Sequence, residues 1–263
     1  MVKFLRTAGL IVCLLFANGC ATTPTEPRVI TVMTYNIHHG EGTDGKLDLE
    51  RIARIIRDQN ADLVALQEVD ENAERTGKVP QAEELGRLTG LQHVFGKAMD
   101  FGGGGYGQAI LSRWPIKDVQ VHQLPQRAGR EPRILLKATI ALREEQLAFC
   151  SAHLDHQLEE VRIEQVNRIN EILKPGAAGS ALLLAGDFNA RPESSSIKSL
   201  LGQWTDTAGE GAAPTIPAGN PRSRIDYIFV APQGAWRVIE SKVLEEPIAS
   251  DHRPLVMRVE NPR

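Results

Sequence analysis

Cysteine and aromatic residues are scarce in this chain, and neither sign of charge dominates it. Three cysteines among 263 residues exclude a disulfide-dense scaffold. Lysine and arginine number 30 and aspartate and glutamate 33, so the chain lacks the basic excess typical of nucleic-acid-binding proteins. The contents of hydrophobic residues, 42%, and charged residues, 24%, exclude intrinsically disordered and polytopic membrane classes. The length allows one large domain or two small ones.

The N-terminal apolar run covers only residues 8–17, which is too short to span a bilayer. It follows Lys3 and Arg6, and a short basic region before an apolar core is typical of a signal peptide. Residues 16–20 resemble a bacterial lipoprotein signal, in which Cys20 is lipidated and becomes the first mature residue. An ordinary cleaved secretion signal is the alternative. We therefore expect export, with a membrane-anchored lipoprotein facing the periplasm or the cell exterior.

Processing at this point would change the charge of the protein. Residues 1–20, the predicted signal peptide, contain two basic residues and no acidic one, so their removal takes the net charge from −3 to −5. Residues 21–28 are rich in threonine and proline, which predicts a tether. Cys150 is then alone in the body of the protein and cannot form an internal disulfide, so we expect it to be a packing residue.

Strand-like and helix-like patterns alternate along the rest of the chain. Helical periodicity appears at residues 49–56, behind the potential N-cap Asp48, and again at 82–88 and 158–173. Strands are predicted at residues 29–36, 63–69, 108–112, 133–142, 146–153, 181–185, 224–230, 236–244 and 254–259. This alternation predicts one α/β domain over residues 29–260, with sheets covered by helices.

Polar residues stand at the ends of these apolar strands. They are Asn36, Glu68, His153, Asp187, Asn189, Asp226, Asp251 and His252. A carboxylate is easily hydrated in a cleft but costly to bury in an apolar core. A turn or a helix cap would explain any one of them. Together they indicate one site built from several loops on a rigid scaffold.

Carboxylates and amide oxygens favour Mg²⁺, Mn²⁺ or Ca²⁺ as the bound metal. Zinc has weaker support, because HExxH and CxxC motifs are absent and only the pairs His38-His39 and His153/His156 suggest it. P-loop and GxSxG motifs are also absent, and the glycine run 102–107 precedes a strand, which favours a surface loop over a dinucleotide site. Metal-assisted attack of water on a phosphoester is the chemistry that remains.

Six short motifs occur along the chain in the order in which a known protein family carries them. They are TYNI at 34–37, LQEVD at 66–70, AHL at 152–154, GDFNA at 186–190, RIDYIF at 224–229 and SDHRPL at 250–255. Over residues 29–260 the chain resembles the endonuclease/exonuclease/phosphatase superfamily, which includes DNases, abasic-site endonucleases, sphingomyelinases and inositol-polyphosphate 5-phosphatases. The resemblance implies a four-layer α-β-β-α sandwich, in which two mixed β-sheets pack face to face between flanking helices.

The same resemblance implies roles for the polar residues. Glu68 would be the principal ligand of Mg²⁺ (or Mn²⁺), supported by Asn36 and Asp251. Asp187 would be the general base for the attacking water, and Asn189 would hold the phosphate. His252, oriented by Asp226, would stabilise charge on a phosphoryl oxygen, and His153 would be a second histidine on the phosphate.

Two further residues are candidates for substrate binding. Arg133 could contact phosphate, and an ordinary surface salt bridge is its alternative. His38 lies two residues after Asn36, so strand alternation would place both side chains on one face; a structural histidine is its alternative.

The negative charge of the body favours a small-molecule or lipid phosphoester over a nucleic acid. A secreted DNase-like nuclease is the first alternative. The second is a non-catalytic binding lipoprotein of the same fold, although the presence of Glu68, Asp187 and His252 argues against it. We expect a monomer that meets the membrane through its lipid anchor.

Overall fold

The computed structural model describes residue 1 and residues 29–142, 145–176 and 181–260. Except for Met1, the predicted signal peptide, the tether and Cys20 lie outside the described residues. Within the described part of the chain, every helix is too short or too polar to cross a membrane.

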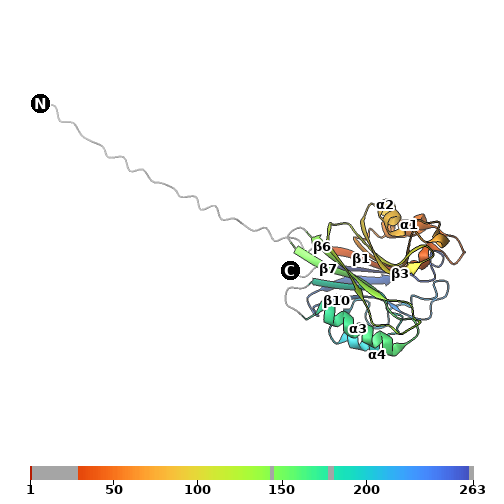
Figure 1. Cartoon of the computed structure of the whole chain (residues 1–263). Helices are drawn as coiled ribbons and strands as arrows, with labels where there is room; N and C mark the ends of the chain where they lie inside the picture. The colour runs from red at the N-terminus through yellow and green to blue at the C-terminus, as the bar shows by residue number, and fades with distance from the viewer. Residues whose placement is uncertain (2–28, 143–144, 177–180, 261–263) are drawn as a thin grey trace.

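Two mixed sheets form the centre of the domain (Figure 1). In spatial order, the first contains β11 (Arg237–Val243), β12 (Leu255–Glu260), β1 (Val29–Asn36), β2 (Leu63–Glu71), β4 (Gly104–Ser112) and β3 (Gln92–Phe101). The second contains β5 (Ile116–Gln123), β6 (Ile134–Leu142), β7 (Glu145–His153), β8 (Ala181–Asp187), β10 (Asp226–Ala231) and β9 (Thr205–Asp206). The pairs β1–β2 and β7–β8 are parallel, and the other neighbours are antiparallel.

Helices cover the outer face of each sheet. In Figure 1, α1 (Leu49–Asp58) and α2 (Gln81–Thr89) lie above the sheets, while α3 (Glu159–Leu173) and α4 (Ser195–Leu201) lie below them. One apolar cluster fills the space between the sheets and contains Phe149 and Met257. Two others lie beneath the helix layers and contain Trp204 and Ile52. The predicted four-layer sandwich is therefore confirmed.

Local sequence signals fix the helix ends as predicted. The Asp48 side chain accepts a hydrogen bond from the main-chain N–H of Arg51 at 2.9 Å, which caps α1. Gly90 ends α2 with a φ of 72°, in the left-handed region that glycine adopts without strain. Two short 3₁₀ turns, η1 (His38–Gly40) and η2 (Glu74–Thr76), follow β1 and β2.

The surface loop predicted at the glycine run 102–107 is wrong. Only Gly102 and Gly103 form the turn between β3 and β4, with φ values of 52° and 78°. The remaining residues belong to β4, where a Cβ on Gly107 would lie 2.0 Å from the carbonyl oxygen of Gly96 on β3. Glycine is needed here because the two strands approach closely, and not because the segment is a loop.

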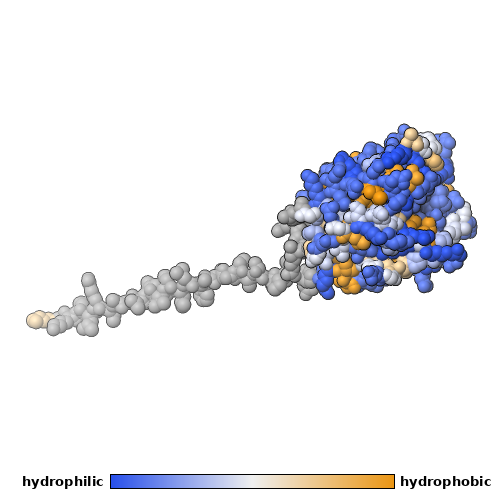
Figure 2. Space-filling view, turned by 90° about the horizontal axis from the view of Figure 1, so that it is seen from below, coloured by the Kyte–Doolittle hydropathy of each residue, from blue (hydrophilic) through white to orange (hydrophobic). Residues whose placement is uncertain are grey.

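The face of the domain in Figure 2 is mostly hydrophilic, with small separate apolar patches. Large exposed apolar side chains such as Leu47, Val119, Leu201 and Ile239 belong to different elements or loops. Apolar side chains scattered in this way are ordinary on a domain surface. The expectation of membrane attachment therefore depends on the N-terminal segment.

Candidate active site

Both sheets bring polar side chains to the same end of the sandwich. Asn36 ends β1, and Glu68 lies near the end of the parallel strand β2. His153 ends β7 and is the register partner of Asp187, which ends β8. Asp226 begins β10 and also pairs with Asp187. A hydrogen bond of 3.2 Å from the Asn36 amide to Asp187 Oδ2 joins the two sheets at this point.

His252 lies between two buried carboxylates. Its Nδ1 is 2.9 Å from Asp226 Oδ2, and its Nε2 is 3.7 Å from Asp187 Oδ2. A carboxylate accepts hydrogen bonds, so the Asp226 contact places a proton on Nδ1. The three side chains offer ligand or proton-transfer atoms within 4.8 Å of one another.

The electrostatics of this group follow from its burial. Burial disfavours the charged imidazolium, but Asp226 and Asp187 outweigh it and raise the pKa of His252. Burial also raises the pKa of Asp187, and Asp226 adds to this effect while His252 opposes it. His252 is therefore protonated at neutral pH, and Asp187 is a stronger proton acceptor than an exposed aspartate.

His153 faces the same carboxylate from β7. Its Nε2 lies 3.5 Å from Asp187 Oδ2, and its Nδ1 lies 3.0 Å from the guanidinium of Arg133. Because a guanidinium only donates, Nδ1 accepts and the ring proton is on Nε2, toward Asp187. Burial, Arg133 and His252 together hold the pKa of His153 well below its usual range, so the ring is neutral.

Arg133 forms the salt bridge of the alternative interpretation, with Glu131, but the arginine itself is buried. Its Nη1 contacts Glu131 at 2.5 Å as well as His153. Its Nε is buried and has no hydrogen-bond partner among the described residues. A buried donor without a partner is rare, so Arg133 stays a candidate for phosphate binding.

The amide of Asn36 has a fixed orientation. Its Oδ1 accepts the main-chain N–H of His38 at 3.1 Å. Its Nδ2 therefore faces the carboxylates and donates to Glu68 Oε1 at 3.0 Å and to Asp187 Oδ2. In this arrangement Asn36 links Glu68 and Asp187 through its nitrogen, and its oxygen is directed away from them.

Asn189 holds Asp187 through its main chain. Its N–H donates to Asp187 Oδ1 at 2.8 Å, and its side-chain amide donates to the carbonyl of Leu154 at 3.1 Å. Its φ of 49° is uncommon for a residue other than glycine and often marks a functional turn. The structure thus places Asn189 beside the predicted general base, with its side chain tied to the β7 segment.

Glu68 lies at a bulge in β2, where the register with β4 shifts between Gln67 and Val69. Its φ is 58°, and a bulge of this kind redirects a side chain out of the strand alternation. One ligand atom of Glu68 lies within 4.8 Å of ligand atoms of both His38 and His39. This group and the Asp187, Asp226 and His252 group are the two potential metal clusters in the described part of the chain.

Asp251 belongs to neither of these two clusters. It is partly exposed, and its carboxylate lies 3.3 Å from Ser250 Oγ. Ser250 in turn donates to the main-chain oxygen of Asn36 at 2.7 Å, which ties the loop before β12 to the end of β1. The loop therefore supplies His252 directly, with Asp251 at its side.

The strand alternation predicted for His38 is wrong. β1 ends at Asn36, and His38 begins a 3₁₀ turn with a φ of 45°. His38 still reaches the neighbourhood of Glu68, but from the 3₁₀ turn and not along the strand.

A polar link that the sequence motifs did not reveal lies beneath the site. Gln67 Nε2 donates to Ser151 Oγ at 3.1 Å, and Thr34 Oγ1 donates to Gln67 Oε1 at 3.3 Å. All three side chains are buried between the sheets. Their presence inside apolar strands is the signal that could have revealed them, since buried polar groups require partners.

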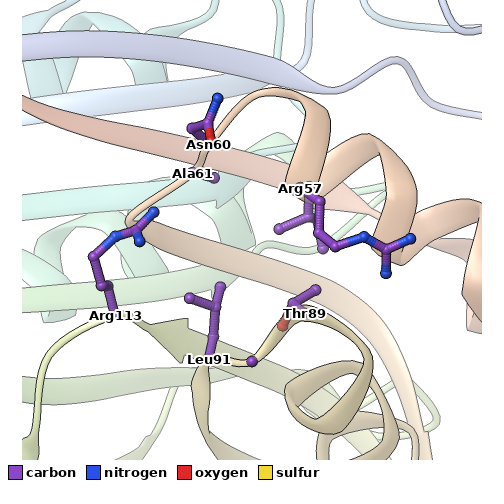
Figure 3. A pocket seen from close by; sticks show the side chains of 8 residues that line it. Arg57, Asn60, Ala61, Thr89, Leu91 and Arg113 are labelled. Atoms are coloured by element: carbon purple, nitrogen blue, oxygen red, sulfur yellow. The ribbon is translucent and has the colours of Figure 1, made fainter.

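A pocket at the other end of the first sheet is separate from this site. It has a volume of about 210 Å³, and Figure 3 shows Asn60, Ala61 and Leu91 on its walls, ahead of the starts of β2 and β3. Its two arginines already have partners, because Arg57 contacts Glu50 and Arg113 contacts Asp62. The polar residues predicted from the sequence lie at the opposite strand ends.

A family model described as the endonuclease/exonuclease/phosphatase family matches residues 33–252, which include every strand end described above. The chain belongs to this family. No curated protein matches the sequence.

Solved structures of the family have the same architecture. An endonuclease/exonuclease/phosphatase from Beutenbergia cavernae is 28% identical with a TM-score of 0.77, over 89% of this chain and 72% of that one. A mannosyl-6-phosphatase from Bacteroides thetaiotaomicron is 20% identical with a TM-score of 0.73, over 88% and 99%. The human Nocturnin catalytic domain with bound sulfate is 22% identical with a TM-score of 0.71, over 89% and 94%. The last two likenesses, below 25% identity, concern the fold alone.

Proposed function

We propose that this protein is a divalent-metal-dependent hydrolase of a small or lipid-type phosphoester. The observation that carries the proposal is the contact of His252 with Asp226 and Asp187 at the strand ends where Asn36 and Glu68 also meet. In phosphoryl transfer, negative charge is distributed over the phosphoryl oxygens, and preorganised donors stabilise it. A buried cationic histidine beside a proton-accepting carboxylate suits this chemistry.

The donor set fits a hard divalent cation. Glu68 and Asp251 supply carboxylate oxygens, which Mg²⁺ and Mn²⁺ prefer. We assign Glu68 as the principal ligand, with Asp251 and Asn36 as supporting residues. A metal bound there would polarise a phosphoryl oxygen as a Lewis acid. In the orientation described above, Asn36 would support the metal by positioning Glu68.

Side chains of the protein carry out the proton transfer and bind the phosphate. Asp187, held by the N–H of Asn189 and the amide of Asn36, accepts a proton from the attacking water. His252 donates a hydrogen bond to a phosphoryl oxygen, and Asp226 keeps its ring charged and oriented. His153 and Arg133 donate further hydrogen bonds to the phosphate. Asn189, in the turn that follows β8, also binds the phosphate.

A small or lipid-type substrate is favoured by charge. A body with a net charge of −5 after processing would repel a long polyanion. Because a mannosyl-6-phosphatase is among the similar structures, phosphorylated sugars join lipid head groups as candidates. A DNase-like nuclease is the alternative.

One panel of substrates tests both the reaction and its class. It contains p-nitrophenyl phosphate, bis-p-nitrophenyl phosphate, mannose 6-phosphate, nucleotides, sphingomyelin, phosphoinositides and plasmid DNA, each with Mg²⁺ or Mn²⁺. We expect hydrolysis of a small or lipid substrate, its loss in excess EDTA and its recovery when Mg²⁺ is returned. Full activity in EDTA would contradict metal dependence, and cleavage of DNA alone would favour the nuclease. A chain inert toward the whole panel would favour a binding lipoprotein.

We also propose that the chain is exported and held in a membrane through a lipid on Cys20, with residues 21–28 as its tether. The motivating observation is the basic, apolar and cysteine-containing order of residues 1–20. In a bacterial host, Cys20→Ala is expected to remove the lipid and move the protein from the membrane fraction to the soluble fraction. Cys13→Ala, within the apolar run, is the matched control and should remain at the membrane. Equal distribution of wild type and Cys20→Ala would favour an ordinary secretion signal.

A further inference from the structure

Two consecutive histidines follow β1 in an uncommon backbone conformation. His38 and His39 have φ values of 45° and 44°, and Gly40 continues the turn with 80°. Residues with side chains occupy this left-handed region uncommonly, and two in succession followed by a left-handed glycine form a tightly defined turn. The turn places the two imidazole rings side by side, with centroids 4.5 Å apart.

The turn also brings both rings to Glu68. One ligand atom from each of the three side chains lies within 4.8 Å of the other two. Glu68 has a left-handed backbone as well, at the bulge in β2. Two separate segments are therefore shaped so that an acid and two imidazoles meet.

Glu41 orients both rings. Nδ1 of His38 lies 3.2 Å from the main-chain oxygen of Glu41, and Nε2 of His39 lies 3.5 Å from Oε2 of the same residue. A main-chain carbonyl oxygen only accepts, so the proton of the His38 ring lies on Nδ1, and the negative Glu41 carboxylate favours a proton on Nε2 of His39. The lone pairs are consequently on Nε2 of His38 and Nδ1 of His39. An N–H directed at a carbonyl or carboxylate, with the other nitrogen left bare, is the usual arrangement of a metal-binding histidine.

The unprotonated ring nitrogen of His39 is available to bind a metal. Its Nδ1 is buried and lacks a hydrogen-bond partner among the described residues. The main chain of His39 is fixed, because its carbonyl accepts from Gln81 Nε2 at 2.7 Å. The nearby cation Arg75 is neutralised by Asp70 through two hydrogen bonds of 2.7 Å. Asp70 therefore offsets the positive charge of Arg75 near this nitrogen.

We propose that His38, His39 and Glu68 form a site for a divalent transition metal such as Zn²⁺, Co²⁺ or Mn²⁺, distinct from the Mg²⁺ position. Two imidazole nitrogens and one carboxylate are a ligand set of zinc and related metals, whereas Mg²⁺ prefers oxygen alone. Because Glu68 is shared, the site adds a second ion to the proposed phosphoesterase and in that respect rests on the proposed function. Metal binding itself can be measured without any substrate.

Co²⁺ is the suitable probe, because its visible spectrum reports nitrogen ligands. Metal-free processed protein would be titrated with Co²⁺ by absorption and with Zn²⁺ by calorimetry. His38→Asn and His39→Asn are the appropriate variants, since asparagine tolerates the left-handed backbone. His122→Asn is the matched control, because His122 lies on β5 and contacts Gln120. Glu41→Gln tests the orientation of the His39 ring alone, because the contact with His38 uses the main-chain oxygen of Glu41.

We expect one Co²⁺ per chain at this site in the wild type, with affinity at least 10-fold weaker in either variant and unchanged in the control. Glu41→Gln should weaken binding by about 10–100-fold. Thermal melting of the metal-free proteins would verify that the variants fold. Absence of Co²⁺ binding, or equal binding by folded His38→Asn and His39→Asn, would overturn the site. Hydrolysis in Mg²⁺ without Co²⁺ binding overturns this site alone, whereas Co²⁺ binding without hydrolysis of any substrate overturns the proposed function alone.

Discussion

Asp187→Asn is expected to reduce turnover by about 10²–10⁴-fold while the protein remains folded. The substitution keeps the shape of the side chain and an oxygen that can accept the N–H of Asn189. It removes the proton acceptor for the attacking water and one of the two carboxylates beside His252. The loss should therefore fall on kcat, because the missing interaction operates in the transition state.

Steady-state kinetics on the best substrate of the panel would measure this effect. Asp118→Asn is the matched control, because Asp118 is exposed on β5 and contacts only a neighbouring glutamine among the interactions described for it. The melting temperature of Asp187→Asn should not fall, because the variant removes a charge from a buried site that already holds Asp226. A kcat within a few fold of the wild type would refute the role of Asp187 as general base.

The sequence was sufficient to predict features that depend on local chemistry. The apolar residues of 158–173 repeat at helical spacing, and α3 spans Glu159–Leu173. The run at 181–185 is apolar throughout, and β8 is buried on both faces because a sheet lies against one side and helices cover the other. Strands β3, β5 and β9 and helix α4 were not predicted. In edge strand β5, Val119 and Val121 alternate with polar residues but are exposed, so the alternation does not mark a face that packs on a core.

The residues of the site could be predicted from the sequence more fully than its geometry, because the geometry depends on how the strands pair within each sheet. Asp187 and Asp226 are far apart in sequence and meet through the register of β8 and β10, which periodicity does not specify. The left-handed turn at His38 and His39 is equally hidden, since nothing in the residue types demands it. His39 was consequently considered only with His38 as a weakly supported zinc pair, although its main chain is held by Gln81 and its Nδ1 is buried without a partner among the described residues.

Asp155 explains a different part of the molecule, the attachment of α3. It is buried, and its carboxylate accepts from Arg130 at 2.5 Å and from the main-chain N–H groups of Gln157 and Leu158 at 2.8 Å each. Burial opposes ionisation, but Arg130 and the two N–H groups outweigh it and lower the pKa of Asp155 to about 2.

This pKa makes the contribution of Asp155 to stability depend on pH. A carboxylate with a folded-state pKa below its unfolded value of about 3.9 stabilises the fold above that value, by roughly 2 kcal/mol for a shift of this size. The contribution is lost as the pH falls from about 4 to about 2, because the unfolded state then binds the proton first. Asp155→Asn should therefore lower the free energy of unfolding by about 2 kcal/mol at pH 7 and by much less near pH 2.

Urea denaturation of wild type, Asp155→Asn and the exposed control Asp118→Asn, measured at pH 7, 5, 4 and 3, would test this dependence. The difference between wild type and Asp155→Asn should be constant from pH 7 to pH 5 and then shrink, while the control difference stays near zero. Because other acids titrate equally in all three proteins, their effects cancel in the differences. A difference that stays constant down to pH 3 would mean that packing or main-chain contacts, and not the charge paired with Arg130, make Asp155 important.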